Sequence, residues 1–565
     1  MNGDSQHPNH VDSIENSPLF SADLAPVRPA SRTWTTWNLA ALWVGMAVCI
    51  PTYLLASYMI RSGLNWYEAL IIIGLANLFI TLPMVLNGHA GVKYGIPFPV
   101  QGRAAFGIFG IHIPSILRGF VACGWFGIQT WIGGLALYSI FNAVTGTVPE
   151  EGISWGKFVG FAAFWFINIY FIWKGTESIK WLEDYSAPLL IIIGIVLVYW
   201  GYSETGSMKD VLEKSDRLGR STITWKDERV LAFTVLDQQN GASRVSEFAI
   251  VEKDAATMKW MAVTPLVATD TLPSFSEAAS FRFRTPDGKG GYHISSPISV
   301  PARSQTPLSP WWNYLIWFTS MVGYWATMSI SISDITRFAK TQKDQLRGQF
   351  IGLPGTMMFY SFVGIFVTSA AVIIFPDILV AEDAPWDPVT LMDRFSSPWV
   401  IVFAQVAMII ATLSTNIAAN VIAPAYAISN LFPKSISFRT GGVIAGLIGV
   451  LMCPWWLMNE ISGILIFVSG LLGPVLAILL CDYFIVRRKT LNVVALYAVD
   501  GEYRYSGGIH WNAMIALLLG AVAGLIGKWI PALEPLYRVS WFTAFATAFL
   551  LYYLLMKRNT AASKE

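Results

Sequence analysis

The sequence has few charged residues. Charged side chains make up 13% of its 565 residues and apolar ones 54%, whereas an ordinary soluble domain is about 25% charged. This composition excludes a cytosolic enzyme, a disordered chain and a nucleic-acid-binding protein. The charges are also uneven, because 26 of them, out of 38 basic and 36 acidic residues, fall between residues 202 and 309. We therefore predict a membrane protein with one insert of soluble composition.

Cysteines and enzyme motifs are scarce as well. The four cysteines (Cys49, Cys123, Cys453 and Cys481) lie within or beside apolar runs and outside the insert, so we expect no disulfide framework. The sequence lacks a His-Glu-x-x-His motif, a Walker loop, a nucleophile elbow and a glycine-rich fingerprint between strand and helix. We expect neither an enzyme nor a bound cofactor.

A polar start is followed by long apolar runs. Residues 1–34 have no basic stretch leading into a short apolar core, which predicts a disordered cytoplasmic tail rather than a signal peptide. A spanning helix needs about 20 mostly apolar residues. Twelve runs qualify: 36–60, 67–87, 115–142, 156–173, 185–201, 311–332, 349–375, 398–430, 440–457, 461–484, 511–530 and 538–556. The predicted fold is an all-α integral membrane protein with twelve transmembrane helices.

Lysine and arginine predict the orientation, because they mark cytoplasmic loops. With the N-terminus inside, the inside segments hold Lys93, Arg103, Lys174, Lys180, Arg337, Lys340, Lys343, Arg347, Lys434, Arg439, Arg487, Arg488, Lys489, Lys557 and Arg558. The outside loop 376–398 is acidic. We predict a multi-pass protein of the plasma (inner) membrane with both termini in the cytoplasm.

The insert follows the fifth helix and so lies outside the cell. Short alternating runs recur at 230–236, 247–252, 259–264, 281–285 and 292–300, with turn signals such as Pro286-Asp287-Gly288 between them. This pattern favours a small β-sandwich without a disulfide. A long, partly ordered loop is the alternative.

Amide and aromatic side chains interrupt the apolar third span. Trp125 and Gln129 are four residues apart and share one helical face. An indole beside a carboxamide can stack on a planar heterocycle and hydrogen-bond its N–H and C=O edge. The alternative is that Trp125 packs and Gln129 bonds a neighbouring helix.

The eighth span has a similar polar cluster. Ala411, Ser414 and Thr415 share a face, and Asn416 and Asn420 are four residues apart. Hydroxyl and carbonyl oxygens suit a monovalent cation, although such small residues also tighten helix packing.

The first and sixth spans show signs of breaks. Pro51, preceded by Gly45 and Cys49, sits in the middle of the first span, and Gly323-Tyr324-Trp325 precedes alternating serines in the sixth. Spans one, three, six and eight are the first and third of two successive sets of five. Broken helices at corresponding places in two halves indicate a transporter site near the membrane midplane.

At these residues the chain resembles the nucleobase:cation symporter-1 family, near its bacterial allantoin, hydantoin and uracil permease branch. The matching segments are 50–53, 93–98, 124–131, 333–337, 414–420 and 482–488. The resemblance implies a five-plus-five inverted repeat with two additional helices and transport by alternating access.

The resemblance also implies roles for single residues. Trp125 and Trp325 would sandwich the substrate ring, and Gln129 and Asn420 would hydrogen-bond its polar edge. Cys49 stands where a hydantoin-transporting relative has a glutamine, which weakens any transfer of that substrate. The sodium site of sodium-coupled members corresponds to the side chains of Ser414 and Thr415 and the main-chain oxygens of Gly45, Val48 and Ala411.

We expect five parts: a tail (1–34), a first repeat (35–201), the insert (202–309), a second repeat (310–484) and helices eleven and twelve with a cytoplasmic C-terminus (485–565). The expected function is import of a neutral nucleobase-like or ureide ring by symport with sodium or a proton. The expected partners are that small heterocyclic substrate, the coupling cation and the lipid bilayer, and no nucleic acid. A membrane sensor whose outer β-domain binds a ligand, and an amino-acid transporter of the same fold, are the alternatives.

Overall fold

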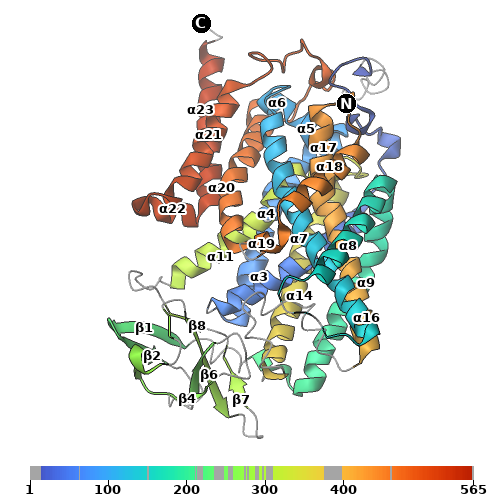
Figure 1. Cartoon of the computed structure of the whole chain (residues 1–565). Helices are drawn as coiled ribbons and strands as arrows, with labels where there is room; N and C mark the ends of the chain where they lie inside the picture. Colours follow the sequence, from blue (N-terminus) through green and yellow to red (C-terminus); the bar gives the residue numbers. More distant parts are fainter. Residues whose placement is uncertain are drawn as a thin grey trace.

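Helices account for most of the described chain and form one bundle, with β-strands at one end of it (Figure 1). This computed structural model describes residues 14–562 except 63, 149, 151, 210, 213–220, 235–246, 252–258, 273–274, 277–278, 287–291, 296–297, 301–309, 375–396 and 459–460. The acidic loop used above to predict orientation falls almost entirely outside the described residues. The two termini lie at the same end of the bundle, opposite the strands (Figure 1).

The longer helices coincide with the predicted apolar runs. Their bounds are α2 (Thr36–Ala47), α3 (Ile50–Arg61), α4 (Trp66–Tyr94), α7 (His112–Thr145), α8 (Trp155–Lys174), α9 (Thr176–Thr205), α11 (Pro310–Tyr324), α12 (Ala326–Ser331), α14 (Gln342–Ile374), α16 (Pro398–Thr415), α17 (Ile422–Leu431), α18 (Phe438–Leu451), α20 (Ile461–Leu480), α21 (Trp511–Leu525) and α23 (Ser540–Ala562). Two π-helical segments, η6 (Asn416–Val421) and η8 (Cys481–Val486), continue α16 and α20.

Ten of the twelve predicted membrane spans, at most, are supported by the length and composition of the helices in the described residues. Within the described residues, eight helices are long and apolar enough to cross a membrane, or ten spans if two bent helix pairs each count as one. The other two predicted segments, 311–332 and 440–457, hold the shorter helices α11 with α12, and α18. All twelve segments contain helix, and twelve crossings stay a prediction.

The first span is broken, and the residue types explain the break. Helix α2 ends at Ala47, Cys49 is extended (φ −147°), and α3 begins at Ile50 with Pro51 in its first turn. Because proline has no backbone N–H, it is tolerated at a helix start but not in the interior. The two halves are bent by 59°, which leaves carbonyl groups in the last turn of α2 free of regular helical partners.

The sixth span is broken between α11 and α12. Trp325 separates the two helices with φ −98° and ψ 3°. The break therefore comes directly after Gly323-Tyr324, whereas Ser329 and Ser331 lie inside α12.

The insert between α9 and α11 contains two antiparallel sheets. The first sheet has the strand order β1 (Thr222–Asp227), β2 (Val230–Thr234), β5 (Leu266–Ala268). The second has the order β4 (Met261–Ala262), β3 (Glu247–Ile250), β6 (Ser280–Pro286), β7 (Tyr292–Ile294). Strand β8 (Ile298–Ser299) also pairs with β6. Phe233 of the first sheet meets Phe248, Phe281 and Phe283 of the second at 5.0–5.4 Å between ring centroids. The two sheets thus share an apolar core, and β1 and β5 are strands that the alternation had not indicated.

The expected disorder of residues 1–34 is wrong for the part that the structure describes. Residues 14–34 form ordered turns, and Leu24 is fully buried. Tyr497 Oη donates a 2.6 Å hydrogen bond to Leu24 O, and both Arg337 Nη atoms donate to Asp23 O at 3.2 Å. Polar composition did not predict order here because the distant loops satisfy the polar groups of this segment.

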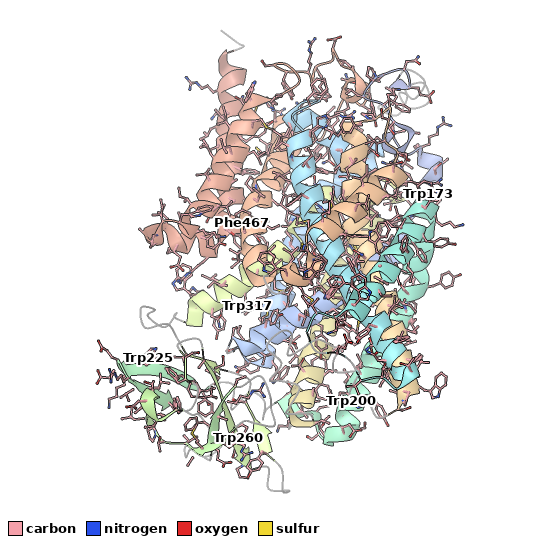
Figure 2. The ribbon with its side chains drawn as sticks, viewed as in Figure 1. Trp173, Trp200, Trp225, Trp260, Trp317 and Phe467 are labelled. Carbon is pink, nitrogen blue, oxygen red and sulfur yellow. The ribbon has the colours of Figure 1, made fainter. Side chains whose placement is uncertain are left out.

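Close packing and aromatic residues shape the bundle. Helices α7 and α8 approach closely at Gly134 and Gly160, where a Cβ on Gly160 would lie 2.3 Å from Gly134 O; small residues of this kind let membrane helices pack. Figure 2 shows Trp173 nearer the end with the termini and Trp200 nearer the end with the strands. Such tryptophans toward both ends are typical of membrane interfaces.

Candidate functional site

The two helix breaks meet beside α7 and the α16–η6 segment. Trp43 of α2 contacts Trp325, at the α11–α12 break, edge-on with ring centroids 5.2 Å apart. Four elements from two distant parts of the chain therefore converge on one small region.

A cavity of about 30 Å³ lies in this region. Its lining residues are Met46, Trp125, Gln129, Tyr324, Trp325, Thr327, Met328, Thr415, Ala419 and Asn420. Four of the five predicted substrate-binding residues, Trp125, Gln129, Trp325 and Asn420, are thus brought together. None of the described lining residues carries a charge.

Two buried polar atoms of this lining lack partners in the described part of the chain. Gln129 Oε1 is an acceptor and Trp325 Nε1–H is a donor, and neither has a hydrogen bond. A buried polar group without a partner costs about 1–3 kcal/mol. The pair therefore presents one acceptor and one donor to a molecule that enters the cavity.

Tyr324 is a site residue whose role the sequence reasoning missed. Its ring lies edge-on to Trp125 at 5.7 Å and to Trp325 at 4.9 Å between centroids. The cavity beside it has a volume of about 30 Å³. Tyr324 contacts both tryptophans, so its position sets the space that is left between them.

Cys49, the fifth predicted residue, lies behind Tyr324 and does not line the cavity. Its Sγ is 3.2 Å from the Tyr324 hydroxyl and 3.3 Å from Thr52 Oγ1, and the Tyr324 hydroxyl is 3.4 Å from Thr52 Oγ1. Residues at the break in the first span, Cys49 and Thr52, thus contact Tyr324 at the break in the sixth span.

The residues predicted for a cation are buried between α2 and α16. Thr415 Oγ1 donates a 2.8 Å hydrogen bond to Gly45 O, in the last turn of α2, and Ser186 Oγ of α9 donates to Ser414 Oγ at 3.2 Å. Val48 and Ala411 are 1% and 3% exposed. Neutral hydroxyl and carbonyl oxygens are the hard ligands that alkali cations accept. Ser186, which the sequence reasoning did not single out, adds a hydroxyl to this set.

Arg118 is a third residue that was missed, because a lone arginine in an apolar run carries no motif. It is 1% exposed and lies on α7. Its Nε donates to Thr327 O at 2.6 Å and its Nη2 to Ala419 O at 3.2 Å. Both acceptors belong to cavity-lining residues, so Arg118 ties α12 to η6 directly behind the cavity. Its charge inside a membrane helix was the available signal.

The two asparagines of the eighth span have different surroundings. Asn416 Nδ2 donates to Thr130 Oγ1 at 3.2 Å and to Asn168 Oδ1 at 3.0 Å, linking α7 and α8, whereas Asn420 lines the cavity. Asn420 Nδ2 donates to Asn416 Oδ1 at 3.2 Å. Both lie in the π-helix η6, an irregularity that is frequent at functional sites.

The chain is similar to known permeases. A family described as "Permease for cytosine/purines, uracil, thiamine, allantoin" matches residues 26–228 and 261–543. The chain is 32% identical to an allantoin permease of Bacillus subtilis, covering 97% of this chain and 95% of that protein. It is also 32% identical to a purine-uracil permease of Arabidopsis thaliana, covering 96% and 78%.

Among solved structures, the fold is similar to that of Mhp1, a nucleobase-cation-symport-1 family transporter solved in a closed conformation with bromovinylhydantoin bound. The TM-score is 0.68 at 22% identity, with 96% of both chains covered. The chain belongs to the permease family for cytosine, purines, uracil, thiamine and allantoin, and is a multi-pass membrane protein and a secondary transporter.

Proposed function

We propose that this transporter imports a neutral ring of the allantoin, hydantoin or uracil class by symport with a cation, through alternating access. The observation that carries the proposal is the unpartnered pair formed by Gln129 Oε1 and Trp325 Nε1–H in an uncharged, aromatic cavity. These rings carry an N–H beside a C=O, which are the complementary donor and acceptor.

Energetics favour a neutral ring over an amino acid. A zwitterion would place two charges in a site whose described lining has none, at a cost of several kcal/mol for each ion. Stacking on an aromatic face contributes about 1–3 kcal/mol, and each hydrogen bond about 0.5–1.5 kcal/mol net. Stacking on two aromatic faces together with three hydrogen bonds gives micromolar affinity, once the entropy cost of ordering the substrate and the side chains is subtracted.

Binding requires Tyr324 to leave its place between the two breaks. The tyrosine then gives up its contacts with Cys49 and Thr52 and opens space between Trp125 and Trp325. We infer that the arrangement described here is closed around the site and that this movement accompanies substrate entry. Asn420, at the η6 side of the cavity, would bond the polar edge of the ring together with Gln129.

Accumulation against a gradient needs an ion. We infer that a monovalent cation binds at Gly45, Val48, Ala411, Ser414 and Thr415, with Ser186 as a further hydroxyl. Moving one charge through about 100 mV supplies about 2.3 kcal/mol, which is roughly fiftyfold enrichment. Sodium suits the neutral oxygens of this set; a proton is the alternative coupling ion.

Coupling between ion and ring follows from the first helix break. The cation would join the end of α2 to α16, and the same break carries Cys49, which contacts Tyr324. Ordering the break by the cation would therefore change the position of the tyrosine. This is the physical link between the two sites that symport requires.

Orientation follows from the loop charges. The termini share one end of the bundle (Figure 1), and that end carries the basic segments, including Arg487, Arg488 and Lys489. By the positive-inside rule we place this end in the cytoplasm, the insert outside and the protein in the plasma membrane.

The test is uptake of labelled allantoin and labelled uracil in cells or proteoliposomes, with competition by hydantoins, pyrimidines and purines. We expect one of these ring classes to compete at micromolar concentration and its affinity to rise with sodium at fixed pH. Equal affinities with and without sodium would refute sodium coupling. Competition by amino acids alone would refute the ring substrate.

A further inference from the structure

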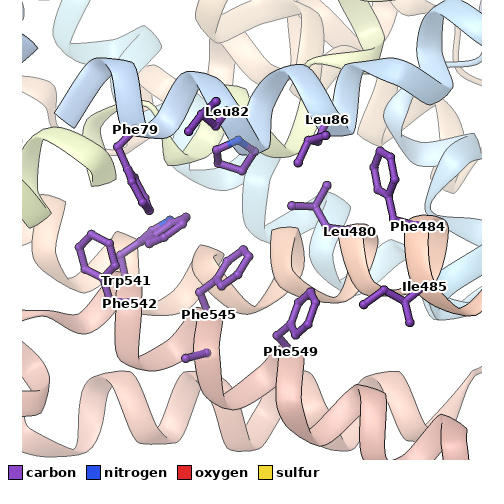
Figure 3. A pocket seen from close by; sticks show the side chains of 12 residues that line it. Phe79, Leu82, Leu86, Leu480, Phe484, Ile485, Trp541, Phe542, Phe545 and Phe549 are labelled. Carbon is purple, nitrogen blue, oxygen red and sulfur yellow. The ribbon is translucent and has the colours of Figure 1, made fainter. Parts of the chain in front are cut away.

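A second cavity lies on the outside of the bundle, away from the central site. It has a volume of about 480 Å³ and is bounded by α4, by α20 with η8, and by α23 (Figure 3). Phe79, Leu82 and Leu86 face it from α4, and Phe545 and Phe549 from α23 (Figure 3). All twelve residues that line this apolar groove have apolar or aromatic side chains.

The groove runs along the helices. Phe79, Leu82 and Leu86 follow one face of α4 at helical spacing, and from Phe79 to Leu86 the helix rises about 10 Å. Phe542 and Phe549 mark a similar rise on α23, and Ala546 between them leaves space beside Phe545. An elongated apolar slot of this shape accepts a hydrocarbon chain and offers no bond to a polar ligand.

Basic side chains lie at one end of the groove. Lys93 is exposed, seven residues beyond Leu86 on the same face of α4. Lys489 Nζ lies 5.4 Å from the ring centroid of Phe484, which itself lines the groove. Arg488 is exposed beside Lys489. Lys93 and Lys489 therefore lie at the end of the groove that we place at the cytoplasmic surface, and Arg488 adds a third exposed base next to Lys489 in the chain.

The chain holds these bases in place. Lys93 Nζ and Tyr94 Oη donate hydrogen bonds to Lys489 O at 2.8 and 2.9 Å, which pins the loop after η8 to the end of α4. Arg488 and Lys489 have φ values of 50° and 64°, a left-handed conformation that non-glycine residues seldom adopt. The side chain of Lys93 donates one of these bonds, whereas Lys489 takes part only through its carbonyl, and the side chains of Lys93, Arg488 and Lys489 are all exposed.

We propose that the groove binds an acyl chain of an anionic phospholipid, whose phosphate lies against Lys93, Arg488 and Lys489. The apolar slot and the cluster of bases at its cytoplasmic end match the two parts of such a lipid. Basic residues at the membrane surface attract anionic lipids by about 1 kcal/mol each, or about fivefold in affinity. A zwitterionic lipid would gain the apolar contacts without this preference.

Native mass spectrometry of the purified transporter, titrated with phosphatidylglycerol or phosphatidylcholine, tests the proposal. We expect one phosphatidylglycerol to bind the wild type at least tenfold more tightly than phosphatidylcholine. The double variant Lys93→Gln with Lys489→Gln should lose about twentyfold in affinity for phosphatidylglycerol and little for phosphatidylcholine. Ala546→Trp, which fills the slot, should weaken binding of both lipids.

A matched control separates this site from general surface charge. Lys174→Gln with Arg439→Gln also removes two exposed bases from the same end of the bundle, and Lys174 likewise lies over an aromatic ring, that of Tyr170, at 5.4 Å. Equal loss in the two double variants would overturn the proposal. So would a protein dimer that disappears in Ala546→Trp, because the groove would then be covered by a second copy. If Ala546→Trp fails to fold, the two double variants still decide.

Discussion

Trp325 tests the substrate site at the scale of a single residue. Trp325→Phe keeps an aromatic face and removes the unpartnered indole N–H. A buried carbonyl of the substrate then loses its donor, which costs about 1–3 kcal/mol, so we expect uptake affinity to fall by roughly five- to 150-fold. The measurement is the KM for the transported ring.

The control for this variant is Trp131→Phe. Trp131, on α7, is buried like Trp325. Its ring packs against Phe158 and Trp455, and it does not line the cavity. Its KM should stay within about threefold of the wild type. An equal change in both variants would mean that the indole of Trp325 acts only in packing.

Tyr324 tests whether the closed site must open. Tyr324→Phe removes the hydroxyl that contacts Cys49 and Thr52 and keeps the ring. Because about 0.5–1.5 kcal/mol for each of these two contacts no longer opposes the movement, we expect binding of the ring to strengthen about five- to 150-fold, measured by scintillation proximity. Weaker binding would show that the hydroxyl contacts the substrate instead.

Asp334 gives the stability of the protein a pH dependence. It lies in α13 (Ser333–Thr336), beyond the sixth span, and accepts a 2.7 Å hydrogen bond from Phe98 N. Burial raises the pKa of this carboxyl to about 7, against 3.8 ordinarily. The folded state therefore favours the protonated form, and its contribution to stability is complete below pH 3.8 and is lost as the pH rises through 7.

The variant Asp334→Asn keeps an oxygen for Phe98 and cannot ionise. We expect the wild type to lose a few kcal/mol of stability relative to this variant between pH 4 and pH 7, at about 1.4 kcal/mol per pH unit in the middle of this range, between the unfolded and folded pKa values. Thermal unfolding in detergent at several pH values measures the difference. A difference that is constant with pH would contradict the prediction.

At the scale of elements, the contact between α2 and α16 tests the cation site. Thr415→Val has nearly the shape of threonine and removes the hydroxyl that bonds Gly45 O. We expect the sodium concentration for half-maximal uptake to rise at least tenfold, with a smaller change in ring binding without sodium, because Thr415 also lines the cavity. Thr412→Val is the matched control, because Thr412 is fully buried on the same helix and its hydroxyl has no partner in the described chain.

The helix breaks show how much of this site the sequence predicts. Pro51 predicts the first break because a proline, which has no backbone N–H, interrupts the hydrogen bonds of a helix at its own position. Gly323-Tyr324-Trp325 marks the second break within a residue or two. The position of Tyr324 against Cys49 was not predictable, because it depends on how two elements some 275 residues apart in sequence are placed. Arg118 was missed for the same reason, since its acceptors are carbonyls of other helices.

At the scale of the whole molecule, the insert tests the sensor alternative. The strands of the insert lie at the end of the bundle opposite the termini (Figure 1), and β7 contacts α14. The variant that tests the alternative replaces residues 205–305. We expect replacement of these residues by a flexible Gly/Ser linker to leave the KM of uptake within about twofold. The measurements are uptake, which gives the KM, and surface expression, which reports folding. A variant that folds but no longer signals would instead favour a sensor.

The sequence by itself determined the membrane class, the apolar segments, the two helix breaks and the family, because these depend on composition and on residues adjacent in the chain. Only the tertiary structure decided that residues 14–34 are ordered, since their partners are arginines and tyrosines in distant loops. It alone also placed Tyr324 between Trp125 and Trp325, set Arg118 behind the cavity and formed the groove beside α23. Each of these features depends on contacts between segments far apart in sequence, which no local pattern records.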